Sequence, residues 1–312
     1  MKINDFIFRF DSNGIISRYG ICRVRIFVNS QAEVYVLLTE LDENPSSSVT
    51  NSIESICQQL LAGKKIPEKA RIIEHYPRHS AFSETFDLVT FDAYFHPDWK
   101  PIGPGGVLKI LECGPEEFED YRKDPRVLSE IRDAIDGIPK LSQFRYTEDP
   151  RISERRLEIF SNQYTKQQVQ DFISSGPAEQ EISAFLKKDL SLIAECYASP
   201  SEEYVCFSEY PIGPGRVDFL LLTGRSRMSV YLIEIKGARD TLCRKNHYRD
   251  FRSSIQEGRS QLLQRADWIE SHYDAFRRTV HETLKEVKQG RTPFGAFPGP
   301  KYKLSVDPNK DI

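Results

Sequence analysis

Residues 215–236 read GRVDFLLLTGRSRMSVYLIEIK, and this stretch decides how the second half of the chain folds. Two runs rich in large apolar and β-branched residues, 216–222 and 230–236, flank a polar segment that contains Gly224. Apolar runs of this length around a polar turn predict two strands that form an antiparallel hairpin.

The register of this hairpin brings charged residues together. With the turn centred on Ser226, Asp218 lies opposite Glu234, and the alternation of side chains along a strand adds Lys236 to the same face. Two facing carboxylates have their Cβ atoms only about 5 Å apart, which is destabilising unless a cation lies between them. Carboxylate oxygens suit Mg²⁺, which keeps several waters and binds substrate phosphate. The register therefore predicts a Mg²⁺ site at which Mn²⁺ would substitute.

This hypothesis has a plain alternative. A register slip of one residue would move the charged side chains apart. The pattern Asp…Glu-x-Lys is also common in proteins, so it can mark an exposed strand end.

The opposite face of the hairpin is expected to be core, and it carries Val217, Phe219, Leu221, Tyr231, Ile233 and Ile235.

Residues 1–115 are expected to form a separate α+β domain. A helix is predicted at 52–62, where apolar residues recur at helical spacing, and a turn at Gly103–Gly106. Strands are predicted at 7–10, 21–27, 33–41, 70–75 and 85–95.

The rest of the chain is expected to form a connector and a second domain. Residues 116–174 are highly charged and have helical spacing, which is typical of a helical connector. The second domain, 175–312, opens with Ser174-Ser175-Gly176-Pro177, a helix-start signal that precedes Glu179 and Glu181.

Composition indicates a soluble globular protein, with 39% hydrophobic residues, 29% charged residues and a net charge of −3. The absence of a long apolar run predicts a cytoplasmic protein without a membrane segment. The six cysteines are scattered and are expected to be reduced thiols. Residues 225–303 carry 17 Lys and Arg against 9 Asp and Glu, so the basic part of the chain is the part expected to meet a polyanion.

The order of these motifs resembles the PD-(D/E)xK nuclease superfamily, and within it the Shedu antiphage defence nucleases. The resemblance covers about residues 177–276. Its most specific parts are Gly215-Arg216-Val217-Asp218, Glu234-Ile235-Lys236 and a helix from Gln261 through Trp268. It implies an α/β fold whose C-terminal restriction-endonuclease-like core is a mixed β-sheet flanked by helices.

The resemblance also implies roles for individual residues. Asp218, Glu234 and Ile235 would hold the metal, and Lys236 would be catalytic. A further acid is expected on the first helix of the domain, with Glu181 preferred and Glu179 as the alternative. Gln261 corresponds to a glutamine that often borders such sites.

A polar, basic stretch follows the hairpin and is interpreted as a phosphate-contacting loop. A mobile, solvated loop is the alternative. Together with Arg216, which shares the face of Asp218, the candidate DNA-binding residues are Arg239, Arg244, Lys245, Arg249 and Arg252.

One long amphipathic helix is predicted after this stretch. The chain ends at Ile312 soon after a strand-like run at 301–306, so the core is expected to be abbreviated or the sequence to be part of a longer one. The predicted buried positions of the helix are Phe251, Ile255, Leu262, Ala266, Ile269, Tyr273 and Phe276.

The leading functional hypothesis is a Mg²⁺-dependent endonuclease that acts on double-stranded phage DNA. The resemblance further implies a homo-oligomer, and we expect no small-molecule cofactor. Two alternatives remain open, a catalytically silent DNA-binding or assembly module with a nuclease fold, and a nuclease directed at RNA.

Overall fold

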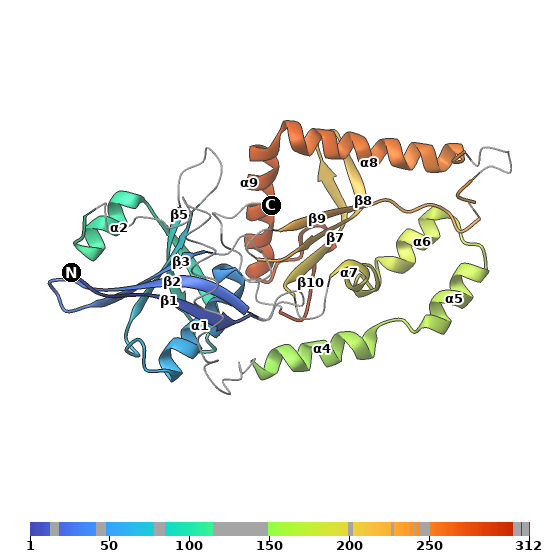
Figure 1. Cartoon of the computed structure of the whole chain (residues 1–312). Coiled ribbons are helices and arrows are strands. Elements are labelled where there is room, and N and C mark those ends of the chain that lie inside the picture. The colour runs from blue at the N-terminus through green and yellow to red at the C-terminus, as the bar shows by residue number, and fades with distance from the viewer. Residues whose placement is uncertain are drawn as a thin grey trace. The chain divides into compact units, whose positions relative to one another are not determined.

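A computed structural model of the chain shows two compact units (Figure 1). The described residues are 1–12, 19–41, 48–77, 85–114, 149–198, 202–225, 228–239, 241–243, 250–301, 307 and 312. The first unit comprises Met1–Thr147, Arg225–Arg227 and Ser305–Lys310, and the second comprises Glu148–Gly224, Met228–Leu304 and Asp311–Ile312.

The first unit is built on a six-stranded sheet whose strands follow one another in chain order. All neighbouring pairs are antiparallel except β3 and β4, which run parallel and are joined by α1 (Val49–Ala62). The strands are β1 (Lys2–Asp11), β2 (Tyr19–Val28), β3 (Val34–Glu40), β4 (Arg71–Tyr76), β5 (Thr85–Phe91) and β6 (Pro97–Ile102).

Alternation along the strands gives this sheet two apolar faces. Val24 and Val36 lie in one core with Ile53 and Leu60 of α1. Leu37 and its neighbours on the other face pack against α2 (Pro104–Leu111). The sheet is therefore the middle layer between two helices, as expected for strands buried on both faces.

The turn predicted at Gly103–Gly106 is wrong. The structure begins α2 at Pro104, with Gly103 as the N-cap residue. Proline fits the first position of a helix because its missing N–H would have no partner there. The glycines of this segment suggested a turn, although the segment begins a helix.

The second unit contains a four-stranded sheet in the order β10-β7-β8-β9, and all its described pairs are antiparallel. The α/β class is confirmed, but the parallel pair that makes a sheet mixed is found in the first unit. Its strands are β7 (Tyr204–Ile212), β8 (Gly215–Thr223), β9 (Ser229–Ile233) and β10 (Phe297–Pro298).

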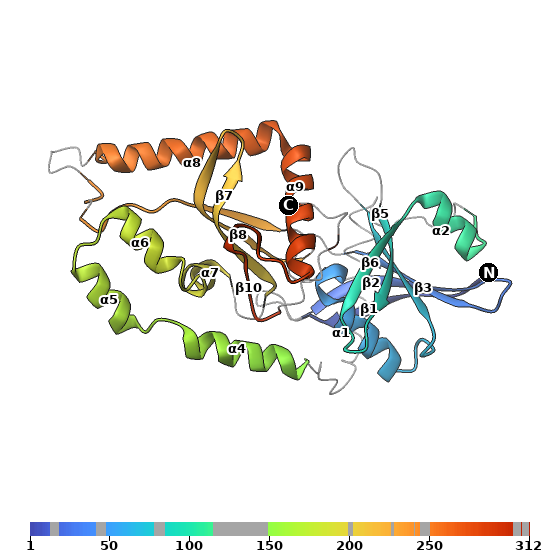
Figure 2. The same ribbon diagram turned by 180° about the vertical axis from the view of Figure 1, so that it is seen from behind.

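Helices cover both faces of this second sheet. The predicted core face is confirmed, because Phe219, Leu221 and Ile233 pack against Ile193 of α7 (Ser191–Tyr197). Figures 1 and 2 show α7 and α6 (Glu179–Leu186) on one side of the strands and α8 (Ser253–Ser271) on the other. Two further helices, α4 (Pro150–Asn162) and α5 (Lys166–Ser174), lie in the 116–174 segment and belong to this unit.

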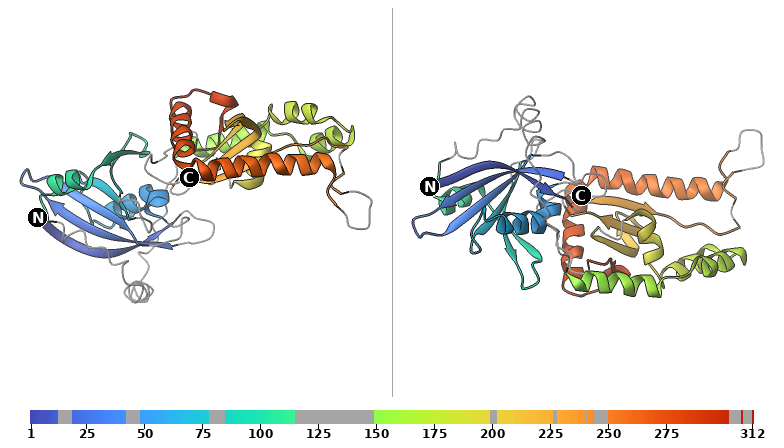
Figure 3. Two further views of the ribbon diagram at one scale, coloured as in Figure 1. Left: turned by 90° about the horizontal axis from the view of Figure 1, so that it is seen from above. Right: turned by 60° about the horizontal axis from the view of Figure 1, so that its bottom comes forward.

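The single long helix predicted after the hairpin is two helices. The chain leaves the helical conformation at His272, and α9 (Tyr273–Lys288) then runs in a new direction (Figure 3). Phe251 lies before α8 and is exposed, whereas Phe276 is buried in α9. The apolar spacing continues through the break, so periodicity alone did not reveal it.

Two expectations from composition can be compared with the structure. All six cysteines, each in the described part of the chain, are free thiols, as predicted. No helix in the described ranges has the length and apolar character needed to cross a bilayer.

An ion pair on the first sheet makes stability depend on pH. Asp5 accepts hydrogen bonds from Arg23 Nε at 2.9 Å, Arg23 Nη2 at 2.7 Å and Lys2 Nζ at 3.0 Å. Burial alone would raise the pKa of Asp5, but the hydrogen bonds and charges of Arg23 and Lys2 outweigh it and lower that pKa.

We therefore expect Asp5→Asn to lower the free energy of unfolding by roughly 1 kcal/mol at pH 6. The ionised carboxylate stabilises the fold above its unfolded pKa, so the difference should shrink as pH falls from 6 through the lowered folded pKa. Urea denaturation across this range measures it, with the exposed Glu68→Gln as the control. A difference that stays constant with pH would contradict the assignment.

Candidate functional site

The β8–β9 hairpin has the predicted register up to the point where the charged residues begin. Leu220 pairs with Leu232 and Leu222 with Val230, as expected for a turn centred on Ser226. The ladder ends at Ile233, one residue before Glu234.

A side chain replaces the backbone partner where the ladder ends. The amide N–H of Ile235 donates to Oδ2 of Asp218 at 2.7 Å. This bond to a carboxylate is charge-assisted and stronger than an ordinary ladder bond. Asp218 thereby fixes the chain that carries Glu234 and Lys236 without a regular strand.

Lys236 lies between two carboxylates. Its Nζ is 3.2 Å from Glu234 Oε1 and 3.3 Å from Glu179 Oε2. The side chains of Lys236 and Glu234 are only 17% and 12% exposed, whereas that of Glu179 is 46% exposed. The structure thus brings together Asp218, Glu234 and Lys236, the three residues that the sequence placed on one face.

The crowding of negative charges shifts the pKa values of these groups. Burial raises the pKa of Glu234, and the nearby charge of Asp218 raises it further. Burial also raises the pKa of Asp218, an effect that the bond from Ile235 opposes and the charges of Glu209 and Glu179 reinforce. Burial would lower the pKa of Lys236, but Glu234 and Glu179 hold its proton and raise that pKa. The arrangement therefore favours additional positive charge.

The preferred helix acid, Glu181, is not part of this cluster. Its Oε2 accepts from the backbone N–H of Ala178 at 2.7 Å, so it closes the first turn of α6. The alternative, Glu179, is the acid that reaches Lys236. Both lie in the first turn, where an acid is favourable, and only the direction of each side chain separates their roles.

Helix α8 approaches the cluster through Gly258. A Cβ atom on this residue would lie 2.8 Å from Lys236 Cε and 3.5 Å from Glu234 Cγ. Gln261 lies three residues further, on the same side of the helix, and is half-buried. Its Oε1 is buried and has no hydrogen-bond partner in the described ranges. Gln261 thus lies about one helical turn from Gly258 with an unused acceptor.

Glu209 and Gly258 were missed by the sequence reasoning. Ser208 pairs with Phe219 and Tyr210 with Val217, which places Glu209 opposite Asp218 on the neighbouring strand. Its φ of 52° is uncommon for a residue with a side chain, and its carboxylate pairs with Lys187 at 2.8 Å. Nothing in the sequence signalled Glu209, whereas the lone glycine inside α8 could have signalled a close approach.

The candidate nucleic-acid contacts are described only in part. Arg216, Arg239 and Arg252 are exposed. Arg252 is the N-cap residue of α8. Arg244, Lys245 and Arg249 lie outside the described residues.

The side chains of the site that would hold a divalent cation are two carboxylates. Within the residues that the structure describes, no three acidic, His or Cys side chains are gathered closely enough to form a metal-binding group. Asp218 and Glu234 supply carboxylates, whereas the amide N–H of Ile235 donates to Asp218 Oδ2 and offers no ligand to a metal. Mg²⁺ needs only one or two carboxylates when waters and phosphate complete its shell, so the residues present are sufficient.

Comparison with known proteins points to one family. Residues 177–296 match the family model described as Shedu protein SduA, C-terminal. This part of the chain is therefore similar to the C-terminal part of Shedu protein SduA. This match confirms the Shedu resemblance that the motifs indicated and includes Glu179, Asp218, Glu234, Lys236 and Gly258. No curated protein and no solved structure matches the chain.

The different positions of Glu179 and Glu181 predict different effects on stability. Glu181→Ala removes a capping bond and should lower the free energy of unfolding by roughly 1 kcal/mol. Glu179→Ala removes one of several crowded negative charges and should change it by less than about 0.5 kcal/mol. Urea denaturation in EDTA compares the two variants, and equal losses would contradict these assignments.

Proposed function

We propose that the chain is a Mg²⁺-dependent DNA endonuclease of the PD-(D/E)xK type that acts in defence against phage. One observation carries the proposal, the gathering of Asp218, Glu234 and Lys236 where the β8–β9 ladder stops. Crowded carboxylates beside a half-buried lysine suit hydrolysis of a phosphodiester, because that reaction needs a bound cation and a positive group near the scissile phosphate. The Shedu match supports the defence role.

Each residue of the cluster has a task that its position explains. Asp218 and Glu234 would hold the metal, which when bound polarises the phosphodiester and lowers the pKa of a coordinated water. Lys236 keeps its proton because two carboxylates surround it, so it would offset charge on the phosphate. Glu179 would orient Lys236. Gln261, with its unused Oε1, would accept a hydrogen bond from water near the metal.

Nucleic acid would approach the side of the site that carries Arg216. This residue precedes Asp218 by two on β8 and is exposed, as are Arg239 and Arg252. Cations near a hydrolytic site contact phosphates and give binding without sequence preference. We expect double-stranded DNA to be the substrate and the chain to act as a homo-oligomer.

Removing a metal ligand should abolish cleavage while the fold persists. We expect Asp218→Asn and Glu234→Gln each to lower Mg²⁺-dependent plasmid nicking by more than about 100-fold, because loss of a group behind the ligands alone costs roughly 10- to 100-fold. DNA binding, measured by fluorescence anisotropy in Ca²⁺, should change little. Glu257→Gln, an exposed carboxylate on α8, is the matched control.

Three outcomes would change the conclusion. Variants that nick as fast as the parent would overturn the assigned site. A parent that binds DNA but never nicks it with Mg²⁺ or Mn²⁺ would establish a silent binding module. Faster cleavage of RNA than of DNA in parallel assays would redirect the activity to RNA.

Gly258→Ala tests the position of Lys236 without lowering the stability of the fold. The added methyl group would lie 2.8 Å from Cε of the flexible Lys236 side chain, and its contact with Glu234 Cγ at 3.5 Å is of ordinary van der Waals length. Alanine also favours a helix over glycine by roughly 0.5–1 kcal/mol, so the melting temperature should not fall. Displacement of the lysine should lower nicking by about 10- to 100-fold. Gly105→Ala, which places its methyl group in open space in α2, is the control, and full activity of Gly258→Ala would contradict the close approach.

A further inference from the structure

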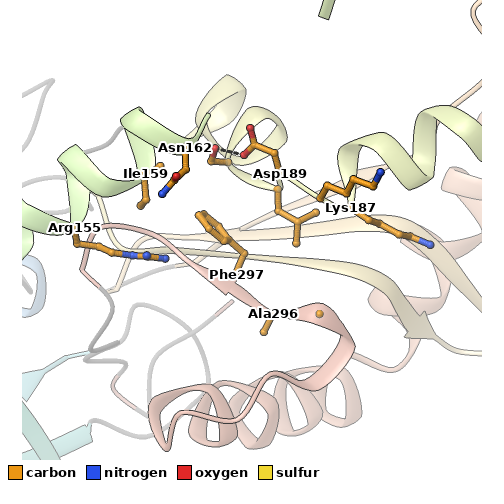
Figure 4. A pocket seen from close by; sticks show the side chains of 11 residues that line it. Arg155, Ile159, Asn162, Lys187, Asp189, Ala296 and Phe297 are labelled. Carbon is orange, nitrogen blue, oxygen red and sulfur yellow. Dashed lines mark hydrogen bonds between the residues drawn. The ribbon is translucent and has the colours of Figure 1, made fainter. Parts of the chain in front are cut away.

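A pocket of about 210 Å³ lies in the second unit (Figure 4). Helix α4, the segment between α6 and α7, and the chain around β10 form its walls. The side chains that matter for its chemistry are Arg155, Asn162, Lys187, Lys188, Asp189 and Phe297.

The lining is cationic. Arg155, Lys187 and Lys188 contribute three positive charges, and Asp189 is the one acidic residue among the lining side chains. Asp189 is already engaged, because it accepts hydrogen bonds from Ser191 Oγ and, at 2.8 Å, from the backbone N–H of Tyr164. The pocket therefore offers a net positive charge to a ligand.

The three cations of the pocket can bind a ligand without the loss of a strong ion pair. Lys188 forms no ion pair with any described residue. Arg155 pairs with Glu158 at 2.8 Å and Lys187 with Glu209 at 2.8 Å, but the two carboxylates are 58% and 43% exposed. Exposed ion pairs contribute little to stability, so a phosphate with two charges can displace them.

An aromatic ring accompanies the charges. The guanidinium carbon of Arg155 lies 5.6 Å from the centre of the Phe297 ring. Figure 4 shows Arg155 and Asn162, both from α4, beside this ring. An aromatic face beside an amide suits a nucleobase, which stacks and forms hydrogen bonds, whereas a bare anion needs neither.

We propose that this pocket binds a single nucleotide unit, with its phosphate on Lys187, Lys188 and Arg155 and its base against Phe297. The volume leaves no room for more than one unit, because the pocket is smaller than the sites of about 300–1,000 Å³ that enclose drug-sized ligands. Arginine and lysine together suit a phosphate, since the first offers a planar pair of donors and the second a compact charge. The same unit can come from a free mononucleotide or from a nucleic-acid strand.

Calorimetric titration of the full chain in EDTA tests the pocket independently of cleavage. The probes are AMP, adenosine, inorganic phosphate and a single-stranded oligothymidylate. We expect AMP to bind at least about tenfold more tightly than adenosine or phosphate alone, because adenosine lacks the charged hydrogen bonds and inorganic phosphate lacks the base stacking.

Variants assign the binding to this pocket. Lys188→Ala and Phe297→Leu should each weaken AMP binding by about tenfold. Lys285→Ala, an exposed lysine on α9 outside the pocket, should leave it unchanged. Lys188 is exposed, so its variant stays informative even where Phe297→Leu unfolds the chain.

Each outcome decides the proposal. Oligothymidylate binding that depends on Lys188, without AMP binding, supports a nucleotide within a strand. Inorganic phosphate that binds as tightly as AMP overturns the nucleotide assignment. Failure of every probe, or binding that Lys188→Ala leaves intact, overturns the site itself. The nicking assay is separate, so failure of the proposed function would leave this result standing.

Discussion

The candidate site depends on the hydrogen bond from the Ile235 amide to Asp218. A further ladder pair would have kept Glu234 and Lys236 in a flat strand. Asp218 instead satisfies the amide with its carboxylate, and a buried N–H must find such a partner. The chain is then held to β8 while it leaves the regular ladder. Its next side chains become available to Gly258 on α8 and Glu179 on α6.

Charge crowding follows from this geometry. The Asp218 carboxylate binds the amide on one side and meets the charge of Glu234 on the other, and burial strengthens the repulsion. Lys236 offsets part of it, and its position depends on the absence of a side chain at Gly258. A divalent cation would bind the carboxylates, water and phosphate at the same time, which a lysine does not do. The protein alone thus has crowded negative charge at this site, which a bound divalent cation would offset.

The register of the β8–β9 hairpin was predictable, because the polar turn between the two apolar runs fixes which residues face each other. The end of its ladder was not, because it depends on competition between a carboxylate and a backbone carbonyl. The choice between Glu179 and Glu181 also escaped the sequence, since both suit a helix start. Glu209 escaped it entirely, because its position opposite Asp218 follows from pairing with β7 and its backbone is in an uncommon conformation.

Helix α6 links these features through its two ends. Glu179 in its first turn pairs with Lys236, and Lys187 just after its last turn pairs with Glu209 opposite Asp218. Lys187 also lines the nucleotide pocket, so one cation serves both places. A phosphate that attracts Lys187 would leave the charge of Glu209 uncompensated beside Asp218, and the carboxylates would then attract a metal more strongly. Because coupling between two sites is reciprocal, metal at the hairpin end would in turn free Lys187 for the phosphate.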